Sequence, residues 1–166
     1  MSAPLAYFIT FHTYGTWLHG HARGSVDVLH NRPGTPYLPA DAVRATAARS
    51  LMKYPEMRLS VDAQRCVTET IREVCMHRNW RLHAVHVLES HVHVVVTSLD
   101  APEKVMSDVK AWCSRRLREQ GHVTGSQRVW SDHGSTRYLN TPPSLAGEIC
   151  YTLYEQGKRE TGTFWP

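Results

Sequence analysis

The chain has 166 residues, of which 42% are hydrophobic and 20% charged, a composition that is typical of a globular domain and excludes a disordered or fibrous chain. The formal net charge of +4 suits a polyanionic partner. Because no apolar run approaches the roughly 20 residues that span a bilayer, we expect one cytoplasmic domain over residues 1–166 and no membrane partner.

The first part of the chain predicts one strand and two helices. Residues 5–14 are rich in aromatic and β-branched side chains, which predicts a strand. Glycines and prolines predict a long loop over residues 20–39, and the alanine-rich residues 41–52 predict a short helix. Ser60 is a candidate N-cap for a helix over residues 60–78, where apolar residues recur at three- and four-residue spacing.

A hairpin and a further helix follow. Residues 81–88 and 91–98 are strand-like runs separated by two residues, which predicts a hairpin. The next helix begins at Pro102, a residue suited to a first turn, and ends at Gly121. One stripe of this helix is predicted to be buried: Val105, Val109, Trp112, Cys113 and Leu117.

Residues 127–139 predict another strand with a bend at Gly134, and Pro142 opens a last helix that we expect to run to about Lys158. The order βαββαβ plus a C-terminal helix is that of the ferredoxin-like plan. We therefore expect an α+β fold, in which two helices cover one face of an antiparallel sheet and leave the other face open.

His91 and His93 stand one residue apart on a predicted strand, so both imidazoles are expected on one face, the open one. Two neutral imidazoles side by side can hold one divalent metal ion. The alternative is that they are two of 11 histidines and simply face solvent. A working site needs a third ligand and a nucleophile from elsewhere in the chain.

The last helix supplies candidates for both. Leu145, Ile149 and Leu153 form its apolar stripe, spaced by four residues. Tyr151 lies about 160° around the helix from Ile149, away from this stripe. Glu155 follows Tyr151 by four residues on the same face and offers a carboxylate ligand. The alternative is a structural tyrosine with its hydroxyl in water.

Several segments carry a resemblance that covers nearly the whole chain. They are Phe-Ile-Thr-Phe-His-Thr-Tyr-Gly at 8–15, Leu-Glu-Ser-His-Val-His-Val-Val at 88–95, the Trp-led strand at 130–139, Tyr-Thr-Leu-Tyr-Glu-Gln at 151–156, and Lys110. With them the chain resembles the single-tyrosine HUH endonucleases, which are the transposases of small single-strand insertion sequences and the REP-associated tyrosine transposases.

The resemblance implies cleavage of single-stranded DNA, with Tyr151 as the nucleophile and a 5′-phosphotyrosine intermediate. It also implies Mg²⁺ or Mn²⁺ held by His91, His93 and Glu155. The family commonly has Gln or Asn where this chain has Glu155, and this departure leaves Gln156 as the alternative third ligand.

The resemblance also places Lys110 near the reacting groups, as a second catalytic residue, against the alternative of a solvated helix lysine. Basic and aromatic residues are candidate DNA contacts: Arg115, Arg116, Arg118, Trp130, His133 and Arg137. For the three arginines the alternative is a role at the helix C-terminus, and for Trp130 it is a place in the core.

The expected partner is single-stranded DNA that forms hairpins, and the expected assembly is a monomer or a homodimer that exchanges tyrosine helices. The competing hypothesis is a protein that binds structured single strands without cutting them.

Overall fold

The computed structural model describes residues 4–18, 40–155 and 163–164. Its sheet is antiparallel and has the strand order β4-β1-β3-β2-β5. The strands are β1 (Ala6–Thr13), β2 (Arg81–Val87), β3 (His91–Thr97), β4 (Trp130–Leu139) and β5 (Thr163–Phe164). The helices are α1 (Ala42–Ser50), α2 (Val61–His77), α3 (Pro102–Glu119) and α4 (Pro142–Cys150), followed by the π-helical turn η1 (Tyr151–Glu155).

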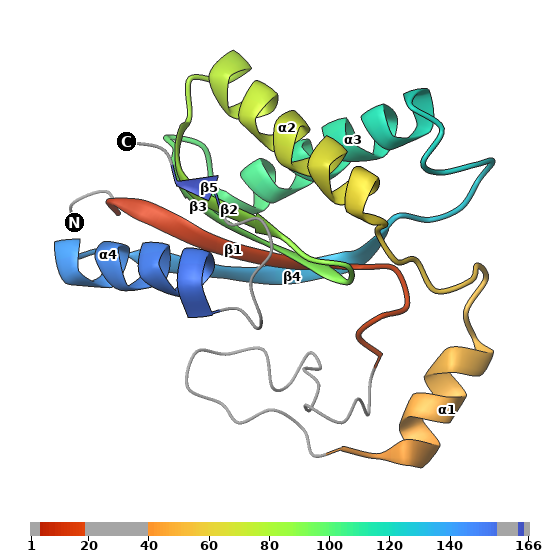
Figure 1. The fold of residues 1–166 in the computed structure, drawn as a ribbon. Helices are drawn as coiled ribbons and strands as arrows, with labels where there is room; N and C mark the ends of the chain where they lie inside the picture. The colour runs from red at the N-terminus through yellow and green to blue at the C-terminus, as the bar shows by residue number, and fades with distance from the viewer. Residues whose placement is uncertain (1–3, 19–39, 156–162, 165–166) are drawn as a thin grey trace.

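The predicted α+β plan is confirmed, since β1 to β4 with α2 and α3 follow the expected βαββαβ order. Both helices pack on one face of the sheet (Figure 1). The Ser60 side chain caps α2 by accepting a hydrogen bond from the Ala63 N–H, as the sequence predicted. The buried core on this face includes Ile9, Phe11, Val67, Ile71, Val74, Val92, Val94, Val105, Val109 and Leu117.

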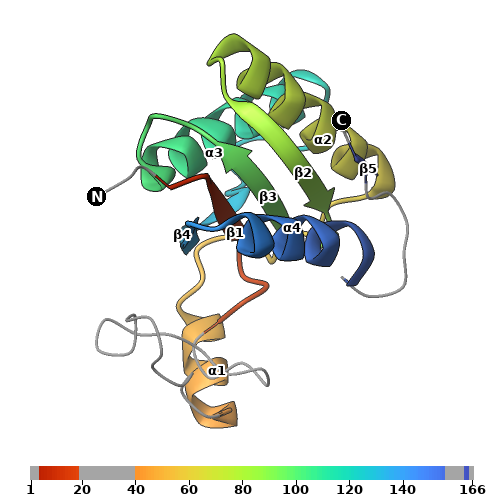
Figure 2. The ribbon, with the colours of Figure 1, turned by 90° about the vertical axis from the view of Figure 1, so that its left-hand side faces the viewer.

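The opposite face is not left open, and the expectation of an open face is corrected. Figures 1 and 2 show α4 lying across this face, on the other side of the sheet from α2 and α3. The predicted stripe of Leu145, Ile149 and Leu153 packs against Phe8 and Val95 of the sheet. An apolar stripe of this kind is stable only when it is covered, and burying one leucine contributes about 2 kcal/mol. The C-terminal helix therefore forms a third, partial layer.

The last helix also differs from the prediction of a continuous helix to about Lys158. The α-helix ends at Cys150, and the next turn is π-helical. In this turn the carbonyl of Thr152 accepts a hydrogen bond from His86 Nδ1 of β2, at 3.1 Å. That contact comes from a distant strand, so the helical periodicity of the segment does not reveal it. Residue 158 lies outside the described residues.

Helix α1 stands beyond the end of the sheet where β1 ends (Figure 1). Asp41 caps it by accepting hydrogen bonds from the Val43 and Arg44 N–H groups, and none of its side chains is buried. The predicted loop over residues 20–39 lies outside the described residues. No helix in the described part of the chain has the length and apolar content that a membrane span needs.

Candidate active site

The two histidines of β3 lie on the α4 side of the sheet, as their alternation predicted. The His93 ring stacks on Phe8, which belongs to the apolar cluster under α4, at a centroid distance of 5.5 Å. The His91 and His93 ring centroids are 4.9 Å apart, and the rings are nearly perpendicular. Both imidazoles therefore face the same small region of the sheet.

Hydroxyl groups orient both rings. A hydrogen bond of 2.8 Å joins Thr10 Oγ1 to His93 Nδ1, and one of 3.0 Å joins Ser90 Oγ to His91 Nδ1. In metal sites the histidine nitrogen that does not bind the ion usually donates to such a partner, which fixes the ring and its tautomer. Because Nδ1 of each ring is engaged here, metal binding would fall to the Nε2 atoms.

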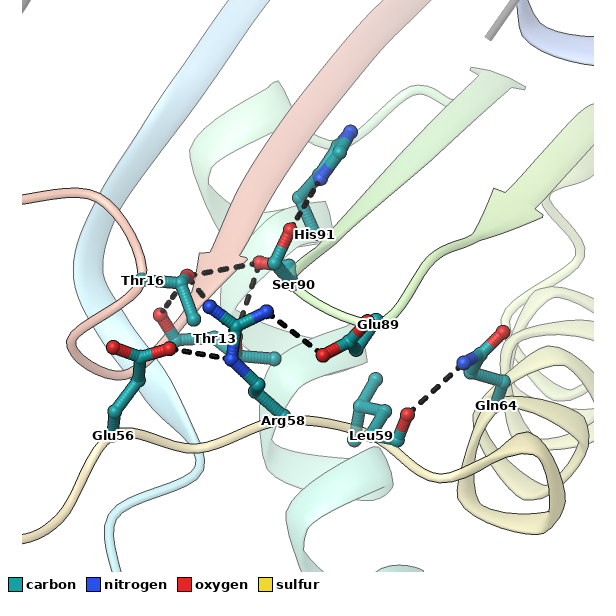
Figure 3. Close-up of polar contacts among 9 residues, drawn as sticks. All are labelled: Thr13, Thr16, Glu56, Arg58, Leu59, Gln64, Glu89, Ser90 and His91. Carbon is teal, nitrogen blue, oxygen red and sulfur yellow. Dashed lines mark hydrogen bonds and ion pairs between the residues drawn. The ribbon is translucent and has the colours of Figure 1, made fainter. Parts of the chain in front are cut away.

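The turn that carries His91 is itself held in place, as Figure 3 shows. The Ser90 carbonyl accepts hydrogen bonds from the hydroxyls of Thr13 and Thr16, at 3.0 and 3.1 Å. Next to it, Arg58 donates to Glu89 at 2.8 Å. The threonine contacts tie the β2–β3 turn to the end of β1, and the Arg58 contact ties it to the segment before α2, so the Ser90 side chain reaches His91 from a fixed backbone.

Tyr151 lies beside the histidine pair. Its ring centroid is 6.1 Å from that of His93 and 6.0 Å from that of Phe8. The side chain is 37% exposed, so it is accessible from outside the protein. The backbone of this turn is held by the bond from His86 to the Thr152 carbonyl, and π-helical turns of this kind are frequent at functional sites.

The third predicted ligand, Glu155, ends the same π-helical turn, but its side chain lies outside the described part of the chain, as does Gln156. Among the described side chains, no group of three or more His, Cys, Asp or Glu residues is arranged to hold a metal ion. The histidine pair is therefore the described part of the candidate metal site.

Lys110 lies on the other side of the sheet, over the ring of Phe11 at 5.5 Å. Its ammonium donates to the carbonyls of Ser131 and His133, at 2.8 and 3.1 Å, where β4 bulges away from β1. Burial, and then the charge of Arg128, lower the pKa of Lys110 to about 8. The structure thus places Lys110 at the β4 bulge and does not bring it to the histidines.

The three arginines of α3 also lie on the side opposite the histidine pair. Arg116 forms a 2.6 Å ion pair with Glu73, and Arg118 donates to the Gln127 carbonyl at 2.9 Å. The Arg115 guanidinium lies 6.0 Å from the ring centroid of Trp112. The structure does not bring any of the three to Tyr151.

The three candidate DNA contacts on β4 differ in their burial and in their distance from the histidine pair. Trp130 is 6% exposed, and its indole N–H donates to the Lys110 carbonyl, so it is a core residue that cannot stack on a base in this conformation. His133 is exposed. Arg137 is the candidate nearest the site: it lies over the Phe8 ring at 5.5 Å and forms an ion pair with Glu148 of α4.

Sequence reasoning missed two residues that shape the site, Thr10 and His86. Thr10 pairs with His93 in the β1–β3 register, and His86 pairs with it in the β2–β3 register. Two-residue alternation on β1 and β2 could have placed each on the histidine face once strand order and register were known. His12 of β1 also lies near the histidine pair, because its ring centroid is 5.3 Å from that of His91.

A protein-family model described as "Transposase IS200 like" matches residues 50–138, more than half of the chain. The chain belongs to this transposase family. It is therefore a DNA-cleaving enzyme. The matched range includes the histidine pair, whereas Tyr151 lies beyond it.

The fold of this transposase agrees with that of one solved structure. It is similar to a REP-associated tyrosine transposase solved bound to a REP hairpin, with a TM-score of 0.52 and 12% identity, over 93% of this chain and 67% of that one. It is also similar to a candidate transposase from Deinococcus radiodurans R1, with a TM-score of 0.48 and 13% identity, over 91% and 90% of the two chains. No curated protein matches the sequence.

Proposed function

We propose that this transposase cuts single-stranded DNA by attack of Tyr151 on a phosphodiester and stores the break as a 5′-phosphotyrosine. The observation that carries the proposal is the position of the Tyr151 ring 6.1 Å from His93, on the face where both histidines lie. In the reaction the phenol releases its proton to water and its oxygen bonds to phosphorus. The bond from phosphorus to the 3′ oxygen breaks, and that oxygen takes up a proton as a free hydroxyl.

The histidine pair fits a divalent ion, because two imidazoles with oriented Nδ1 atoms present Nε2 as ligands. We propose Mg²⁺ or Mn²⁺, with Glu155 as the third ligand and Gln156 as the alternative. Such an ion supplies Lewis-acid polarisation of a non-bridging phosphate oxygen. Relative to the family's usual amide, a carboxylate at position 155 adds negative charge near the scissile phosphate.

The protein's own residues would do the positioning. Thr10 and Ser90 hold the two imidazoles, and His86 holds the turn that carries the nucleophile. Phe8 packs against both Tyr151 and His93, which keeps the two rings at one place on the sheet. The Arg137 guanidinium lies above the same Phe8 ring and is paired with Glu148, and we propose that it exchanges this partner for a DNA phosphate.

The proposed substrate is a DNA hairpin with unpaired flanks, bound by a monomer or a homodimer. Supporting this choice, the similar REP-associated transposase was solved with a REP hairpin. The net charge of +4 suits such a polyanion.

The test is a labelled hairpin oligonucleotide with single-stranded tails, incubated with the protein and Mg²⁺ or Mn²⁺. We expect a covalent protein–DNA adduct on a denaturing gel, which Tyr151→Phe abolishes. Tyr154→Phe is the matched control, since Tyr154 lies in the same turn and is 62% exposed. An adduct that persists in Tyr151→Phe would refute the assignment of the nucleophile. Binding that a chelator leaves unchanged, with no adduct, would favour the non-cleaving hypothesis instead.

A further inference from the structure

A continuous row of aromatic rings crosses the sheet from the tyrosine turn to the segment after β1. It runs from Tyr151 through His93, His91 and His12 to Trp17. Each ring centroid lies within about 6 Å of the next. Trp17 closes the row, with its ring 4.8 Å from that of His12. The row therefore connects the candidate active site to a part of the surface that the proposed reaction does not use.

The row ends at an open surface pocket of about 300 Å³, which is lined by residues from the end of α1, from the segment after β1 and from the start of β4. Trp17, Tyr14 and Met52 contribute an aromatic and apolar wall, together with Leu51, whose side chain is 81% exposed. Pockets of this volume lie at the lower end of the range for small-ligand sites. Leu51 and Trp17 together offer an apolar surface on which a flat aromatic group can pack.

The same pocket carries polar groups at one side. Arg128 and Asp132 line it and form an ion pair with each other, and the Arg128 guanidinium lies 5.5 Å from the Tyr14 ring centroid. A guanidinium fork and a carboxylate offer donors and an acceptor to the edge of a heterocycle. Aromatic platforms combined with cationic groups are also how proteins bind the bases of single strands.

The backbone keeps this pocket close to the end of β1. Gly15 has φ +77°, a left-handed conformation that favours glycine, and a Cβ at this position would collide with the Met52 side chain. The main chain between Tyr14 and Trp17 therefore turns tightly and packs directly against Met52. Trp17 follows this turn two residues after Gly15, and its ring lies against that of His12.

From these observations we infer that the pocket binds one unpaired base of the DNA strand, stacked on Trp17, close to the phosphate that Tyr151 attacks. The inference rests on the proposed function, because it takes the histidine pair as the place of the scissile phosphate. The His12 ring lies between those of Trp17 and His91, so the Trp17 and His91 ring centroids are at most about 10 Å apart. At about 3.4 Å for each stacked nucleotide, this distance corresponds to three nucleotides or fewer. The pocket would thus help select the sequence at the cleavage site.

The test measures DNA affinity in the Tyr151→Phe background, so that the oligonucleotide stays intact. A fluorescent hairpin with unpaired tails is compared with versions in which one tail base at a time is replaced by an abasic site. We expect one position at which base removal weakens binding about 10-fold, the size expected of base–aromatic stacking. Trp17→Ala should abolish this penalty, and Trp17→Phe should retain most of it.

Trp112→Ala is the control, because Trp112 lies on α3, on the opposite side of the sheet, and should keep the penalty. If every abasic penalty is the same in Trp17→Ala as in the parent, the pocket assignment is overturned while the proposed function stands. If no hairpin oligonucleotide binds at all, the proposed function fails and the pocket assignment fails with it.

Discussion

Replacing His86 by leucine should loosen the turn that carries Tyr151 without unfolding the domain. His86 is 3% exposed, and its Nδ1 donates to the Thr152 carbonyl at 3.1 Å. Leucine fills similar space but cannot donate, so this contact to the carbonyl is lost. The Thr152 hydroxyl is also buried and has no hydrogen-bond partner in the described part of the chain. It therefore does not replace the donor that the Thr152 carbonyl would lose.

The expected cost follows from this geometry. Leaving one buried carbonyl without its donor costs about 1–3 kcal/mol. At 1.4 kcal/mol for each factor of ten, a local cost of about 2 kcal/mol corresponds to a 30-fold rise in the opening of the turn. A typical domain has a free energy of unfolding of about 5–15 kcal/mol, so most of the protein should stay folded.

Hydrogen exchange followed by mass spectrometry measures this opening directly in the protein without DNA. In His86→Leu, the amides of Tyr151–Glu155 should exchange about 30-fold faster, and the core strands should be unchanged. His86→Asn should restore slow exchange, because asparagine keeps an N–H donor near the position of Nδ1. His83→Leu is the matched control, since His83 lies on the same strand but contacts Thr97.

The reasoning is refuted if the turn exchanges within about 2-fold of wild type in His86→Leu. It is also refuted if every segment exchanges faster to the same extent, because that result means general destabilisation rather than release of one turn. If the turn opens as expected, adduct formation with a hairpin oligonucleotide should fall while DNA affinity stays nearly unchanged.

Two further predictions concern Thr10 and Lys110. Thr10→Val removes the hydroxyl bonded to His93 Nδ1 and should weaken Mn²⁺ binding about 10-fold or more, as measured by calorimetry. Thr10→Ser keeps the hydroxyl and should bind Mn²⁺ as wild type does. Equal affinities in Thr10→Val and wild type would argue against the metal site. Lys110 has its pKa lowered from 10.5 to about 8, so between these values the unfolded chain binds more protons than the folded one. Wild type should therefore gain stability relative to Lys110→Met as pH rises through this window, and a constant difference in urea unfolding would contradict this.

The sequence by itself determined the features that depend on backbone periodicity. The alternation of β3 put His91 and His93 on one face, and the four-residue spacing of Leu145, Ile149 and Leu153 marked the apolar stripe of α4 and η1 that packs on the sheet. These predictions held because side chains repeat every two residues on a strand and every 3.6 on a helix, whatever lies around them.

Only the tertiary structure decided which residues surround the histidines. Strand register placed Thr10 opposite His93 and His12 opposite His91, and helix docking brought the Thr152 carbonyl of the π-helical turn to His86. The same packing put Lys110 at the β4 bulge, away from Tyr151. Register and docking depend on contacts between residues far apart in the chain, and local periodicity does not predict those contacts.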